Sequence, residues 1–222
     1  MKQRVLLVVL GLSVCLALIG AYVHMQSWKG FQGAPVQGSR AYVAELHTSD
    51  LRDGSKLGVG ALYVARDNLR YELNGKGPLK HVFLLVRLDS GQARLVNAAG
   101  NKYLEGSFTP QRWMDIGHLL GAFPKVASPR IISSNEELLG REELAGYKAD
   151  KILRTGREVL FGEEREFAEF FWLTDESCIP LRHENGRVRS ELANIREKDL
   201  DDSLFELPDE CRKVASISEL LQ

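Results

Sequence analysis

Two short stretches, Gly60-Ala-Leu-Tyr-Val64 and His81-Val-Phe-Leu-Leu-Val-Arg-Leu88, are apolar at odd and even positions alike. In a β-strand successive side chains point to opposite faces, so a strand of this kind puts apolar groups on both sides of its sheet. Each side then needs a cover, or one side must hold an apolar ligand. The alternative is a sheet that curves closed on its own core and binds nothing.

Turn signals divide the surrounding sequence at short intervals, with no helical pattern between them. This spacing predicts an antiparallel meander beginning near Ala41. Later strands are predicted at 146–154, 167–174, 179–183 and 188–195. The turn signals of the early part are Asp53-Gly54, Asp67-Asn68, Asn74-Gly75, Asp89-Ser90-Gly91 and Ala99-Gly100-Asn101.

One segment breaks this pattern and predicts a helix from Thr109 to Phe123. Thr109 can cap the helix, Pro110 suits its first position and Pro124 ends it. Four apolar residues fall on one face at helical spacing, and we expect that face to cover part of the sheet. They are Trp113, Ile116, Leu120 and Phe123.

The N-terminus predicts delivery across a membrane. Lys2 and Arg4 precede an apolar run from Val5 to Val23, which is the pattern of an export signal and is also long enough to span a bilayer as a helix. We expect residues 1–26 to be a signal peptide or an uncleaved anchor. In either case the body lies on the periplasmic side of the inner membrane, since positive residues stay inside.

After this leader, residues 27–40 have the Gly- and Gln-rich composition of a flexible linker. About 190 residues remain, which suits one domain with a sizeable core. We expect that domain at 41–214 and a C-terminal tail at 215–222. The formal net charge is −1 and no basic block stands apart, which argues against nucleic acid as a partner.

Two cysteines of the body, Cys178 and Cys211, flank the predicted hairpin with the Asn185-Gly186 turn. Outside the cytoplasm they can be oxidised, and both fall toward one end of the predicted sheet. The sequence allows a disulfide between them or two unpaired thiols.

The sequence contains no constellation of nucleophile, base and oxyanion donors, so we expect no enzyme. The five histidines are scattered, and we expect no metal and no cofactor. Three acidic pairs are interpreted as solvated charges in turns: Glu136-Glu137, Glu142-Glu143 and Asp201-Asp202.

The segment from Gly60 to Leu73 resembles the second-strand motif of the periplasmic lipoprotein carriers of the LolA family. The order of several landmarks is also similar to the uncharacterised bacterial family DUF4412, over residues 41 to 214. Those landmarks are Arg70-Tyr71-Glu72, Asn101-Lys-Tyr103-Leu-Glu105, Leu144-Ala-Gly146-Tyr-Lys-Ala-Asp150, Phe171-Trp172-Leu173 with Ile179-Pro180-Leu181, and Leu204-Phe205-Glu-Leu-Pro208.

This resemblance implies a mainly β (α+β) fold: a curved antiparallel half-barrel whose concave face is lidded by the main helix. It implies a cavity for acyl chains. Arg66 matches an arginine of the carrier motif that is tied to lid closure, although Asp67 stands where the carriers have proline, and the alternative is a solvated strand-end arginine.

We therefore expect a non-enzymatic envelope protein that binds a lipid or a lipidated polypeptide. The alternative is a membrane-tethered sensor or adaptor whose sheet edge or lid binds another envelope protein. The residues expected to line or lid the ligand site are Tyr63, Arg66, Phe83, Leu85, Trp113, Leu120 and Phe123.

Overall fold

The computed structural model describes residues 41–73, 79–109, 114–120, 122–123, 130–160, 162–174 and 179–222. The leader, the linker, the Asn74-Gly75 turn, Trp113 and Cys178 lie outside these ranges. Within them, no helix is both long enough and apolar enough to cross a bilayer.

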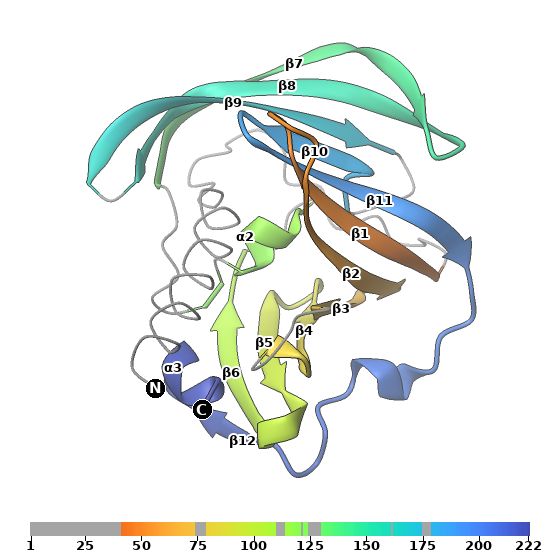
Figure 1. Ribbon diagram of the computed structural model, residues 1–222, viewed down its shortest axis with the longest axis vertical. Helices are drawn as coiled ribbons and strands as arrows, with labels where there is room; N and C mark the ends of the chain where they lie inside the picture. Colours follow the sequence, from red (N-terminus) through yellow and green to blue (C-terminus); the bar gives the residue numbers. More distant parts are fainter. Residues whose placement is uncertain are drawn as a thin grey trace.

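The fold is a single open sheet of twelve strands in the order β12-β6-β5-β4-β3-β2-β1-β11-β10-β9-β8-β7. It curves strongly, so that β7–β9 arch over one side while β3–β6 lie on the other (Figure 1). The predicted mainly β curved sheet is confirmed. The strands are β1 (Tyr42–Asp50), β2 (Lys56–Ala65), β3 (Asn68–Leu73), β4 (Val82–Arg87), β5 (Gln92–Asn97), β6 (Lys102–Ser107), β7 (Arg130–Leu144), β8 (Tyr147–Leu160), β9 (Glu163–Leu173), β10 (Arg182–Asn185), β11 (Val188–Glu197) and β12 (Arg212–Val214).

Neighbouring strands pair antiparallel, as the turn signals predict, except that β12 runs parallel to β6. Gly54 and Gly91 adopt positive φ in the turns that follow β1 and β4, and Asn101 does so before β6. These conformations are cheap for glycine and tolerated by asparagine, which is why these residue types mark the turns in the sequence.

The predicted helix is much shorter than expected. Helix α2 covers only Ile116–Leu120, and its first bond runs from the Leu119 amide to the Asp115 carbonyl, so Thr109 does not cap it. Met114 precedes the helix and is buried without being helical. Gly117 lowers the helical propensity, and so short a helix depends on the burial of its side chains for its stability.

The longest strand, β7, was not predicted, and two acidic pairs assigned to turns lie within it. Two bulges interrupt its register, between Ile131 and Ser133 and between Leu138 and Gly140. Because each bulge shifts the alternation by one residue, the apolar positions of β7 do not follow a period of two along the sequence. The third pair, Asp201-Asp202, does lie at a loop and the start of the 3-10 helix η3 (Asp202–Phe205).

The segment expected as a C-terminal tail packs on the sheet. Helix α3 (Ile217–Leu220) begins with a Ser216 cap, and Leu220 is fully buried in the main core. The Asn97 side-chain amide donates a hydrogen bond to the Leu220 carbonyl at 2.8 Å. Residues 215–222 thus belong to the folded body.

We predict that Gly60→Ala lowers the free energy of unfolding by about 1–3 kcal/mol, because a Cβ at Gly60 would collide with the ring of Tyr71, which lies over it. Gly58 lies on the same strand, and its Cβ would meet open space, so Gly58→Ala serves as the matched control. Urea denaturation measures both. Equal effects of the two substitutions would contradict this packing.

Candidate functional site

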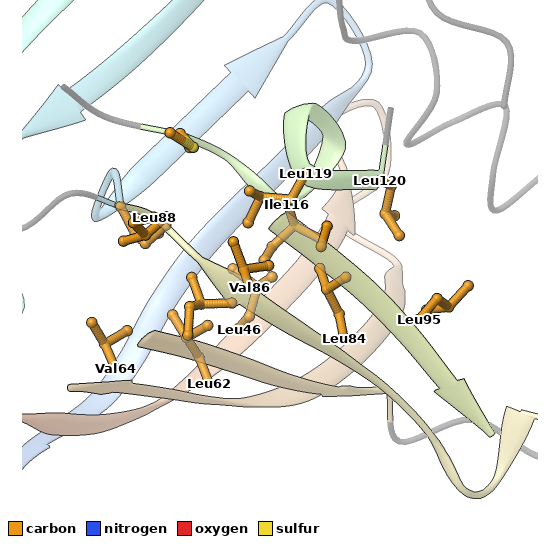
Figure 2. Close-up of a cluster of buried hydrophobic side chains, with 14 of the residues drawn as sticks. Leu46, Leu62, Val64, Leu84, Val86, Leu88, Leu95, Ile116, Leu119 and Leu120 are labelled. Carbon is orange, nitrogen blue, oxygen red and sulfur yellow. The ribbon is translucent and has the colours of Figure 1, made fainter. Parts of the chain in front are cut away.

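The concave face of the sheet, defined as the face toward α2, is filled by side chains from the α2 segment. Ile116, Leu119 and Leu120 point at the sheet residues Leu84 and Val86 (Figure 2). Met114 and Phe123 join the same cluster, and all five of these α2-segment side chains are at most 8% exposed. The short helix α2 thus covers the part of the concave face on which it lies, as the sequence predicts.

A pocket lies on the concave face, between α2 and strands β1, β10 and β11. Its free volume is about 50 Å³, enough for a few water molecules. Pockets that hold lipid- or drug-sized ligands are roughly 300–1,000 Å³. This pocket is thus too small for an acyl chain. The lining residues are Leu46, Thr48, Tyr71, Asp115, Ile116, Gly117, Ile179, Pro180, His183, Asn185, Val188 and Ser190.

A row of charged residues runs from the pocket across the arching strands. Val188 and Asn185 line the pocket, and the register continues from Asn185 to Glu169, Arg154 and Glu136. Positions paired across a sheet lie on the same face, so this row belongs to the concave side. The core therefore changes from apolar to ionic along the sheet.

The centre of the row is a buried ion pair between Arg154 and Glu169, which are 4% and 1% exposed. His183 Nε2 contacts the other oxygen of Glu169 at 3.1 Å. The Phe171 ring stacks on His183 with centroids 4.5 Å apart, and the Arg154 guanidinium lies 4.8 Å from the same ring. Each charged group has a partner, as burial requires.

Burial shifts the pKa values of Arg154, Glu169 and His183. It raises the pKa of the Glu169 carboxyl and lowers the pKa of Arg154 to about 10. The pKa of His183 is lowered to about 3, chiefly by burial and further by the positive charge of Arg154. His183 is thus neutral at physiological pH, and the arrangement is a structural network with no exposed nucleophile.

Asp115 and His183 both line the pocket, but they do not form part of a metal-ligand set. In the part of the chain that the structure describes, no three His, Cys, Asp or Glu side chains come together where they could hold a metal.

Of the predicted site residues that the structure describes, which exclude Trp113, Leu120 and Phe123 lie on the concave face. Phe83 and Leu85 alternate with Leu84 on β4 and point to the convex face, where they form a second cluster with Val96. The period of two within β4 requires this division.

Two further predicted residues also lie away from the pocket. Tyr63 is half-buried and alternates with the fully buried core residues Leu62 and Val64, so it too faces the convex side. Arg66 is exposed in the β2–β3 turn at a positive φ of 53°, and its role at a lid stays a prediction.

Cys211 carries a free thiol and packs against the convex cluster. Burial raises the pKa of this thiol, which makes it less reactive. Cys178 lies outside the described residues, so its pairing with Cys211 stays a prediction.

The sequence offered little signal for several residues that build the site. Met114 and Leu119 are not among the four residues of the predicted apolar stripe, yet both are buried, and Leu119 lies three residues after Ile116 on the same face of the helix. Arg154, Glu169 and His183 come from three different strands and meet only through the register.

No protein-family profile matches the chain, and no curated protein matches it either. Among solved structures it is similar to an uncharacterized conserved protein from Thermus thermophilus, with 14% identity, 80% of this chain and 91% of that chain covered, and a TM-score of 0.48. It is also similar to PNGF-II, with 13% identity and a TM-score of 0.48, and the match covers 79% of this chain and 31% of that chain. A LolA superfamily protein from Nitrosomonas europaea matches with 11% identity and a TM-score of 0.35, over 77% of this chain and 92% of that chain. Likenesses this weak carry no argument about function, and membership of DUF4412 stays a prediction.

We predict that protonation of His183 opposes folding. The unfolded chain takes up this proton near pH 6.5, whereas the folded protein does so only near pH 3. Between these values the unfolded state binds more protons, so the contribution of His183 to stability is lost as the pH falls through this window.

The measurement is the free energy of unfolding of wild type and His183→Gln from pH 7 to 4.5. The advantage of wild type over the variant should shrink steadily as the pH falls. A constant difference across this range would show that His183 is not buried in the neutral form.

Proposed function

We propose that the chain is a non-enzymatic cell-envelope protein that binds an apolar ligand, a lipid or a lipidated polypeptide, on its concave face. In this proposal the structure is the closed form, and the ligand replaces the side chains of α2. The observation that carries the proposal is that a five-residue helix, with its two flanking residues Met114 and Phe123, closes the concave apolar surface.

The energies of the two states support such an exchange. Burial of an apolar side chain contributes about 2 kcal/mol, so the five buried side chains of the α2 segment contribute on the order of 10 kcal/mol. An acyl chain of about fourteen methylenes contributes a similar amount at roughly 0.8 kcal/mol each. A ligand can therefore displace α2 at little net cost, and α2 can return when the ligand leaves.

The place of action is proposed from the leader. The positive start and apolar run of residues 1–26 support a body held on the periplasmic side of the inner membrane, either anchored or released. Lipids and lipidated polypeptides are available in that compartment.

A second function is favoured by the closed state of the same surface. If α2 never leaves, the concave face is an ordinary core, and the protein is a membrane-tethered adaptor that binds another envelope protein and no lipid. The free volume of about 50 Å³ is the observation on its side.

We predict that Leu119→Ala raises the affinity for a fluorescent long-chain fatty acid by about tenfold or more. Leu119 is fully buried, and truncation of a buried leucine destabilises its site by a few kcal/mol, where about 1.4 kcal/mol is tenfold in affinity. Destabilising the closed form therefore shifts the equilibrium toward the ligand-bound form. Fluorescence titration measures the affinity, and native mass spectrometry of protein purified from membranes detects lipid carried from the cell.

The matched control is Leu85→Ala, the same truncation at a buried residue of the convex cluster. It should destabilise the fold and leave the affinity unchanged. Weaker binding by Leu119→Ala would show that α2 is a wall of the site and not its occupant. Absence of fatty-acid binding and of co-purified lipid in wild type would favour the adaptor.

A further inference from the structure

The concave face changes from apolar to polar within two residues along its central strands. Leu46 on β1 lies opposite Leu192 on β11, and the next pair on the same face is Thr48 opposite Ser190. His183 on β10 lies opposite Ser190 and continues this second row. A row of neutral polar side chains therefore lies directly beside the apolar row of the core.

The pocket beside α2 is where this polar row faces open space. All three residues of the row line the pocket, and so do Tyr71 and Asn185. Burial raises the pKa of Tyr71 to about 12, so its hydroxyl keeps its proton. The hydroxyls of Thr48, Tyr71 and Ser190 have no hydrogen-bond partner among the residues that the structure describes. They are therefore available to a ligand.

The pocket gives a charged group no fixed partner of opposite sign. Among the described residues, no lysine or arginine lines it, and its carboxylate, Asp115, lies in the segment of α2. Arg154 belongs to the ionic row that follows on the sheet, and it is already paired with Glu169. Because an unpaired buried charge is strongly destabilising, the fixed wall of the pocket suits an uncharged polar group.

We propose that this pocket holds the head group of the ligand, and that this head group is uncharged and carries hydroxyls, as in a monoacylglycerol. The inference rests on the proposed function, because the acyl chain takes the place of the α2 side chains. Ile116 belongs both to the pocket lining and to the apolar cluster under α2, so the place of the head group and the place of the chain are continuous.

The size and the chemistry of the pocket fit such a head group. A free volume of about 50 Å³ suits a few water molecules, and a glycerol head group has a similar bulk. Thr48 and Ser190 lie directly opposite each other, with Cβ atoms about 4.5–5.5 Å apart, so one head group can contact both. Each hydroxyl can donate and accept, and both come from strands that stay in place when α2 moves.

Competition against the fluorescent fatty acid tests the head group on the full-length wild type at pH 8, where palmitic acid is ionised. Monopalmitoylglycerol, palmitic acid and hexadecylamine have apolar chains of similar length, so differences in affinity report on the head group. Monopalmitoylglycerol should bind about tenfold more tightly than either charged ligand, where tenfold corresponds to about 1.4 kcal/mol.

The outcomes separate this inference from the function on which it rests. Equal or tighter binding of palmitic acid or hexadecylamine would overturn the uncharged head group and leave lipid binding standing. Binding of none of the three ligands would contradict the proposed function itself, and the inference with it.

Two substitutions test the residues. Thr48→Val combined with Ser190→Ala removes both hydroxyls at little change in volume. It should weaken the binding of monopalmitoylglycerol by about tenfold and leave palmitic acid within about twofold. The matched control is Ser49→Ala, at the next residue of β1, which points to the opposite face and should change neither affinity. Equal weakening of both ligands by the double variant would show that these residues shape the cavity without recognising the head group, and would overturn the proposal.

Discussion

The structure depends on the burial of the α2 side chains against the concave face of the sheet. A strand such as β4, with Val82, Leu84 and Val86 on one side and Phe83 and Leu85 on the other, cannot leave either side in water at low cost. The helix is too short to be stable alone, so it depends on packing against the sheet, and the sheet in turn depends on the helix to cover its concave face.

The convex face is also apolar and also needs a cover, which here is a segment of chain and not a helix. The chain after β11 crosses this face, and Leu207 with Cys211 packs on the cluster of Phe83 and Leu85. Arg70 donates a hydrogen bond of 3.0 Å to the Leu204 carbonyl and so ties this segment to the sheet. The guanidinium of Arg70 also lies 3.9 Å from the Phe83 ring. Each apolar face therefore has its own cover, and the concave cover borders a pocket.

Local signals in the sequence predict the meander well. Asp53-Gly54 and Asp89-Ser90-Gly91 mark turns because few residues adopt the required backbone, and this preference acts within a few residues. The two-sided strands also predict two covers. Tertiary features escape the sequence: the bulges of β7 hide its alternation, and Phe83 could not be assigned to a face until its register was known. Arg154, Glu169 and His183 lie on three different strands, so no local sequence motif predicts that they form a buried network.

The central claim is that α2 occupies the place of the ligand, and hydrogen–deuterium exchange tests it most directly. The Leu119 amide donates to the Asp115 carbonyl in the closed form and is protected there. With a saturating long-chain fatty acid the account predicts faster exchange in α2 and unchanged exchange in β4. Unchanged or slower exchange in α2 with the ligand bound would contradict it.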